Sequence, residues 1–130
     1  MNASQLIKLA ILRQAHEWFD GVILPESING EAIDAAWDEN DDGDYQDAKN
    51  EFRCSGTPTN ITAPSSRHYE ADSVYAEIEG RHVGWTHWHG GGKFGEPEAI
   101  DWIDSAYFLS VKSQRTVVKY EFEVLGGEQE

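Results

Sequence analysis

The spacing of apolar residues changes partway along this chain, and the change restricts it to folds that combine helices with strands. Residues 4–19 place apolar side chains about 3.6 residues apart, which is typical of an amphipathic helix. Ser4 is a suitable N-cap for this helix, and Gly21 is a suitable stop. The chain therefore begins with a predicted helix that has one apolar face.

The next part of the sequence is less regular. Ile33 and Trp37 lie one helical turn apart after an Asn-Gly turn, which predicts a second, shorter helix. Residues 38–47 are too acidic to form core, and residues 55–66 are rich in Ser, Thr, Pro and Gly. Both of these segments are predicted to be surface loops.

Alternating apolar and polar residues replace the helical spacing in the second half of the chain. Residues 74–78 alternate in this way, Gly80 marks a turn, and residues 83–89 continue in the same pattern, which predicts a β-hairpin. Residues 107–111 and 117–124 predict a second hairpin with one face in water.

These elements predict an α+β fold in a single domain, residues 1–130. Its antiparallel sheet has about four strands, with the N-terminal helix and the shorter helices packed on one face. The segment EPEAIDWID is helix-like because Pro97 suits a first helical turn. The length of 130 residues suffices for one hydrophobic core. Residues 126–130 are predicted to be a disordered tail.

The net charge of −14 is concentrated in one part of the chain. Residues 14–52 contain twelve carboxylates and one lysine, which gives −11 in that segment. An acidic surface repels phosphates, so direct binding to nucleic acid or to anionic lipid is disfavoured. Lys8 and Arg13 interrupt the apolar N-terminal stretch, which lacks a signal-peptide pattern. With its single cysteine, Cys54, the chain is expected in a reducing bacterial cytosol.

The acidic segment supplies the first candidate binding surface. We expect its carboxylates to bind a host protein that handles nucleic acid, because such proteins carry basic grooves. The candidate residues are Glu31, Asp34, Asp38, Glu39, Asp41, Asp42, Asp44 and Asp47.

The same segment also contains the opening of a calcium loop. The pattern D-x-N-x-D-G requires oxygen ligands at its first, third and fifth positions and a glycine at its sixth. The metal ligands predicted here are Asp38, Asn40, Asp42 and Asp44. The twelfth position should be a glutamate but is Lys49, which weakens the match. No cofactor is therefore expected, and calcium remains the alternative.

The stretch GWTHWHGGGKFGEP contains the second candidate surface. Its glycine-lysine pair is followed by Phe94 and not by a hydroxyl residue, so it does not complete a phosphate-binding loop. Its HGGG run matches the oxyanion-hole motif of esterases, but the chain has no G-x-S-x-G nucleophile motif. With no complete catalytic or cofactor motif, the protein is expected not to be an enzyme. We interpret the glycines as a turn.

The aromatic and histidine residues before these glycines are expected to lie on a strand. His87 and His89 would then share a face and could bind a metal together with His82 or His68. Two tryptophans three positions apart would lie on opposite faces, with one in the core. The predicted second contact with a partner consists of Trp85, His87, Trp88, His89 and Lys93.

The segment GWTHWHGGGKFGEPEAIDWIDSAYFLSV, with EFRC and SRHYEADSV before it, resembles small uncharacterised proteins of bacteriophages and prophages. The resemblance covers roughly residues 50–111 and transfers no functional residue. Small acidic phage proteins include inhibitors of host defence, such as anti-CRISPR and anti-restriction proteins, some of which mimic DNA. The resemblance thus implies an anti-defence inhibitor that binds protein. The alternatives are a metal-binding or small-molecule-binding accessory protein and a generic protein-interaction module.

Overall fold

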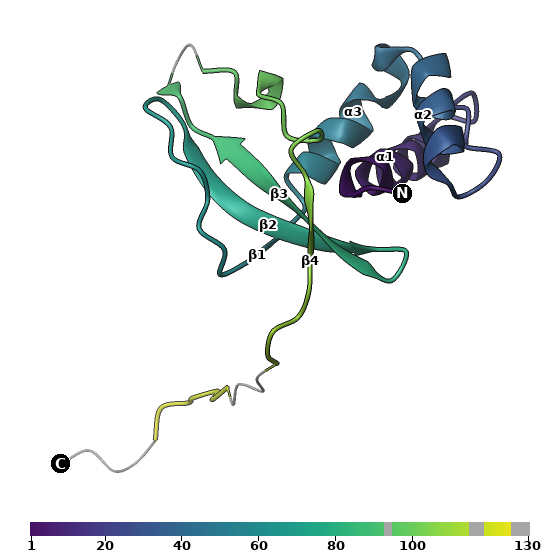
Figure 1. Cartoon of the computed structure of the whole chain (residues 1–130). Coiled ribbons are helices and arrows are strands. Elements are labelled where there is room, and N and C mark those ends of the chain that lie inside the picture. The colour runs from purple at the N-terminus through teal and green to yellow at the C-terminus, as the bar shows by residue number, and fades with distance from the viewer. Residues whose placement is uncertain (93–94, 115–118, 126–130) are drawn as a thin grey trace.

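The computed structural model describes residues 1–92, 95–114 and 119–125. A helical layer packs against one face of an antiparallel sheet, so the predicted α+β fold is confirmed (Figure 1). The elements in chain order are α1 (Ala3–Trp18), α2 (Gly30–Glu39), α3 (Asp42–Arg53), β1 (Thr57–Pro58), β2 (Glu70–Ile78), β3 (Arg81–His89), the 3-10 helix η2 (Pro97–Ala99) and β4 (Tyr107–Leu109).

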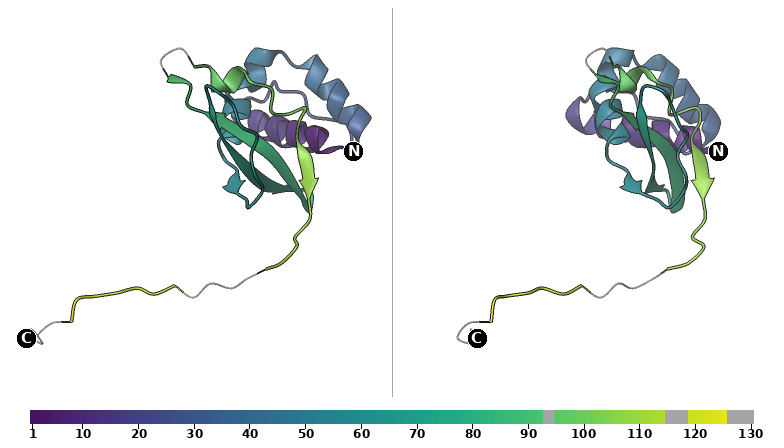
Figure 2. Two further views of the ribbon diagram at one scale, coloured as in Figure 1. Left: turned by 60° about the vertical axis from the view of Figure 1, so that its left-hand side comes forward. Right: turned by 90° about the vertical axis from the view of Figure 1, so that its left-hand side faces the viewer.

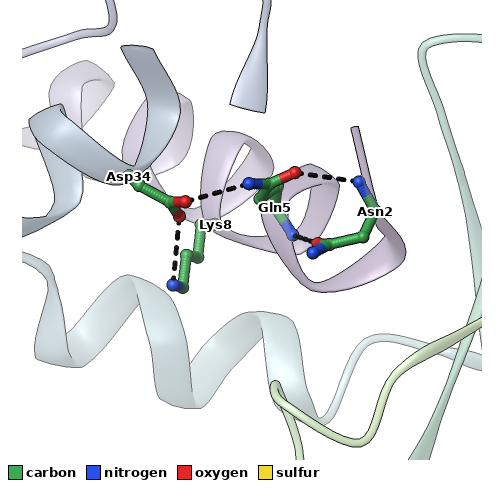
Figure 3. Close-up of polar contacts among 4 residues, drawn as sticks. All are labelled: Asn2, Gln5, Lys8 and Asp34. Atoms are coloured by element: carbon green, nitrogen blue, oxygen red, sulfur yellow. Dashed lines mark hydrogen bonds and ion pairs between the residues drawn. The ribbon is translucent and has the colours of Figure 1, made fainter. Parts of the chain in front are cut away.

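Helix α1 begins one residue earlier than predicted, because Asn2 caps it. The Asn2 side chain accepts a hydrogen bond from the backbone N–H of Gln5, and the Gln5 side chain accepts one from the backbone N–H of Asn2 (Figure 3). This reciprocal pair is a capping box, and it satisfies two N–H groups that the helix leaves free. The assignment of Ser4 as the N-cap was wrong.

The predicted acidic loop at residues 38–47 is also wrong, because α2 continues to Glu39 and α3 starts at Asp42. Asn40 forms the sharp connection between the two helices. Its amide oxygen accepts from the backbone N–H of Ile23, and its amide nitrogen donates to the backbone oxygens of Ile23 and Ala36. The two bonds to Ile23 join residues 17 positions apart, so only the tertiary structure provides them, whereas the bond to Ala36 is local.

The four strands lie in the order β1, β2, β3, β4, and every neighbouring pair is antiparallel. The predicted first hairpin is confirmed as β2 and β3, joined by Glu79 and Gly80. Both residues have positive φ, 51° and 74°, which suits the tight turn of a two-residue hairpin loop.

The second predicted hairpin does not form in the part of the chain that the structure describes. Its first strand exists as β4, but residues 119–125 form no strand and extend away from the sheet (Figure 1). Residues 117 and 118, and the predicted tail 126–130, lie outside the described residues. The remaining sheet position is taken by β1, which comes from the segment predicted to be a loop.

Helix α1 is central to the core, with α2 and α3 on one side and the sheet on the other (Figure 2). Its residues Leu6, Ile7, Ile11 and Leu12 are completely buried. No helix within the described residues is both long and apolar enough to cross a membrane.

An aromatic cluster joins the end of α3 to the sheet and to the segment that follows η2. The ring of Phe52 lies 5.1 Å from Trp85 and 6.4 Å from Trp102, measured between centroids. Only the first turn of the predicted helix-like segment is helical, as η2, and Trp102 is then drawn into the core. The stacked rings hold α3 against β3.

Candidate functional site

The eight predicted acidic residues come from two consecutive helices and the connection between them. Seven of their side chains are exposed, and Asp34 is half-buried. Within the described residues, none of those seven lies within ion-pair distance of a cationic side chain. We call these seven the acidic surface: Glu31, Asp38, Glu39, Asp41, Asp42, Asp44 and Asp47.

Asp34 differs from these seven because its carboxylate has partners within the fold. One of its oxygens accepts from the Gln5 side-chain nitrogen at 2.9 Å, and the other lies 3.4 Å from the Lys8 ammonium (Figure 3). The carboxylate thus connects α2 to α1 and has a positive charge beside it. The side chain of Asp34 stays 45% exposed, so its contact with a partner remains a prediction beside this structural role.

An aromatic pair holds the end of α2 against the start of α3. The rings of Trp37 and Tyr45 stack with 4.1 Å between their centroids, and the Tyr45 hydroxyl donates to Asp42 at 2.7 Å. Burial, and then the carboxylates of Asp42 and Asp38, raise the pKa of the Tyr45 hydroxyl well above its ordinary value. Carboxylates from both helices therefore gather around one buried side chain.

Helix dipoles act in opposite directions on two pairs of residues of the acidic surface. Asp42 and Asp44 lie in the first turn of α3, where the positive end of the helix dipole favours carboxylates. Asp38 and Glu39 lie in the last turn of α2, which contains no basic residue and where the dipole disfavours negative charge. Helix stability therefore favours carboxylates at positions 42 and 44 and disfavours them at positions 38 and 39.

The predicted calcium ligands do not form a loop around a common centre. Asp38 is on α2, Asp42 and Asp44 are on α3, and both the oxygen and the nitrogen of the Asn40 amide are hydrogen-bonded to backbone groups. Within the described residues, no three His, Cys, Asp or Glu side chains are grouped to hold a metal ion.

The predicted second contact is split between the two faces of the sheet. Trp85 is completely buried in the core, so its assignment to a contact surface was wrong. Trp88 is half-buried on the opposite face, as the spacing predicted. His87 and His89 lie on the helix side of the sheet, with 5.3 Å between their ring centroids. Lys93 lies outside the described residues.

The two histidines belong to a cluster that the sequence reasoning missed. His89 lies between two carboxylates of β2, with Nε2 2.9 Å from Asp72 and Nδ1 3.4 Å from Glu70. Burial lowers the pKa of His87, with smaller effects from Arg53 and His89. The hairpin register, which pairs Glu70 with His89 and Asp72 with His87, was the signal that could have located this cluster.

A hollow of about 420 Å³ lies on the open face of the sheet. Trp88 and Tyr107 form part of its wall, and Ile61 and Pro64 come from the loop after β1. Its floor includes Ser73 and Thr86, which face each other across β2 and β3. No sequence motif predicted this hollow, because its lining comes from five separate segments.

The chain matches no protein-family model, and neither curated proteins nor solved structures gave a match.

Proposed function

We propose that the protein is a non-enzymatic, phage-type inhibitor of host defence that binds a basic protein surface through its acidic surface. The observation that carries the proposal is the set of seven exposed carboxylates on α2, α3 and their connection, none of which lies within ion-pair distance of a cationic side chain in the described residues. The partner is a nucleic-acid-handling complex in the bacterial cytosol. We propose that the protein binds neither nucleic acid nor membranes directly.

Asp38 and Glu39 support a binding role because they are unfavourable for the helix that carries them. A carboxylate at the C-terminal turn of a helix destabilises it, by about 0.3–1 kcal/mol at low ionic strength. Surface residues that cost stability without a local contact are expected where binding needs them. Helix stability alone would therefore disfavour Asp38 and Glu39, so their presence in the acidic surface supports a role in binding.

The chemistry of the acidic surface fits the proposed partner. A groove that binds phosphates presents lysine and arginine side chains, and clustered carboxylates attract the same cations. Exposed charges are screened beyond about 8 Å at physiological salt, so such binding weakens steeply as salt rises. A tight complex at low salt that dissociates at high salt is the expected behaviour.

The test is affinity capture from bacterial lysate with a salt gradient, comparing wild type with the double variant Asp38→Asn, Glu39→Gln. The variant should release its partner at clearly lower salt while its free energy of unfolding stays equal or rises by up to about 1 kcal/mol. The matched control is Glu98→Gln, Asp104→Asn, which removes the same charge from exposed residues outside the acidic surface. Equal elution of all three proteins would remove the acidic surface from the proposal.

Reversing the charges of Asp41, Asp42 and Asp44 is a less specific test. Cations in the first turn of α3 oppose the helix dipole, so those variants should lose stability as well as binding. The double variant Asp38→Asn, Glu39→Gln is expected to weaken binding without a loss of stability, so it separates the two effects.

The calcium alternative has an independent test, the melting temperature with and without millimolar calcium. A ligand that binds only the folded state raises the melting temperature by mass action. We expect no rise, because the Asn40 amide is already bonded to Ile23 and Ala36. A rise that disappears in Asp42→Asn would establish the cation site instead.

A further inference from the structure

The most exposed of the large apolar side chains in the described residues lie in one short segment after the sheet. Tyr120, Phe122 and Val124 are 77%, 87% and 92% exposed. They alternate with Lys119, Glu121 and Glu123. This is the pattern of a strand with one apolar face, and large apolar groups left in water mark an interaction site.

The segment containing these residues does not contact the sheet of its own chain. Residues 119–125 extend away from the folded body in every view (Figures 1 and 2). Residues 110–114, which follow β4, are also exposed and form no strand. We call residues 119–124 the C-terminal arm.

The sheet itself has an edge with unpaired backbone groups. β4 is the last strand in the sheet order, and within the described residues it pairs only with β3. The outer N–H and C=O groups of such an edge strand can pair with an added strand.

The two faces of β4 differ in character. Phe108 is opposite Val83 and therefore lies on the helix side, where the guanidinium of Arg81 covers its ring at 3.5 Å from the centroid. Tyr107 and Leu109 lie on the other side, so that face of the edge is apolar. Arg81 forms no ion pair with any described carboxylate.

We propose that the C-terminal arm forms a strand on the β4 edge of a second copy of this chain. The alternating apolar and acidic side chains of the arm match the two different faces of β4. With Tyr120 and Phe122 on the side of Tyr107 and Leu109, the glutamates lie on the side of Phe108 and Arg81.

Charge complementarity supports the pairing of the arm with the β4 edge, and the position of the arm away from its own sheet assigns that edge to a second copy. In a chain of net charge −14, Arg81 is a cation beside the edge, and Glu121 and Glu123 are the carboxylates that an added strand brings to it. Because each copy has one arm and one β4 edge, the exchange is reciprocal and closes as a two-fold symmetric dimer. The proposal is independent of the acidic surface, which lies on α2, α3 and their connection.

The experiment is a charge exchange followed by the molecular mass in solution. Wild type should be a dimer. Arg81→Glu should weaken dimerisation at least about tenfold, and so should the double variant Glu121→Arg, Glu123→Arg, because like charges then face each other. A mixture of the two variants should recover a dimer with one chain of each, identified by native mass spectrometry. Glu77→Arg, an exposed change on β2, is the control and should remain dimeric like wild type.

Other outcomes would overturn the proposal. A monomeric wild type whose arm amides exchange rapidly with deuterium would mean that no second copy binds the arm. A monomer with protected arm amides would mean that the arm folds onto its own sheet. Variants that all dimerise like wild type, or a mixture that fails to recover, would exclude the pairing of Arg81 with the glutamates.

Discussion

At the scale of single residues, the glycine run after β3 forms a turn. Gly90, Gly91 and Gly92 have φ of 79°, 88° and 70°, a region that other residues enter only with strain. A Cβ at Gly91 would lie 2.6 Å from the Tyr69 ring, whereas a Cβ at Gly92 would meet no atom within 4 Å. The interpretation of this stretch as a turn is confirmed for the described glycines.

Gly91 and Gly92 provide a matched pair of alanine variants. Gly92→Ala should cost about 1 kcal/mol, the strain of a left-handed residue. Gly91→Ala should cost about 1–3 kcal/mol more, because the added methyl group also displaces the Tyr69 ring. Urea denaturation measures both, and equal losses would show that the contact with Tyr69 has no effect on stability.

His87 should make stability dependent on pH. Its pKa in the folded protein is lowered from the ordinary 6.5, mainly by burial and further by Arg53 and His89, with Asp72 opposing. Below pH 6.5 the unfolded chain binds a proton at His87 more readily than the folded chain does. The free energy of unfolding therefore falls as pH falls.

The decline in the free energy of unfolding from about pH 7 to about pH 5 should therefore be smaller in His87→Gln than in wild type. His68→Gln, which changes an exposed histidine outside the cluster, should leave the decline as in wild type. An unchanged decline in His87→Gln would contradict the burial effect.

At the scale of elements, helix ends explain where the structure departs from the sequence prediction. The spacing of apolar residues located α1 correctly, but Asn2 caps it instead of Ser4 because only Asn2 has Gln5 three residues ahead. The acidic segment looked like a loop by composition. It starts a helix because the α3 dipole favours its carboxylates and because Tyr45 and Ala48 are buried.

The capping box predicts the effect of two neighbouring substitutions. Asn2→Ala removes a side-chain bond to the Gln5 N–H and should cost about 1 kcal/mol of stability. Ser4→Ala, inside the helix, should have little effect or be slightly stabilising. Thermal or urea unfolding of both variants distinguishes them, and the reverse order would restore Ser4 as the cap.

At the scale of the whole molecule, charge opposes the compact state. A net charge of −14 on 130 residues produces self-repulsion that salt screens. Raising sodium chloride from about 20 mM to about 500 mM shortens the screening length several-fold and should raise the melting temperature. The double variant Asp38→Asn, Glu39→Gln should show a smaller rise. A melting temperature that falls with salt would mean that favourable ion pairs dominate.

Sequence alone determined the elements whose apolar spacing is unambiguous. Residues of α1 repeat with the period of a helix, and β2 and β3 alternate about a Gly80 turn, so local geometry fixes both. The −11 segment was also visible in the sequence, since charge is a property of composition. These features depend on residues close together in the chain.

Only the tertiary structure decided which residues of each candidate set lie together. Trp85 is completely buried and leaves the predicted contact surface, whereas Asp34 is paired with Lys8 and joins α2 to α1. The unpaired C-terminal arm also differs from its expected hairpin, although its alternation is that of a strand. The physical reason is the same in each case: burial and pairing depend on residues distant in sequence, which no local pattern specifies.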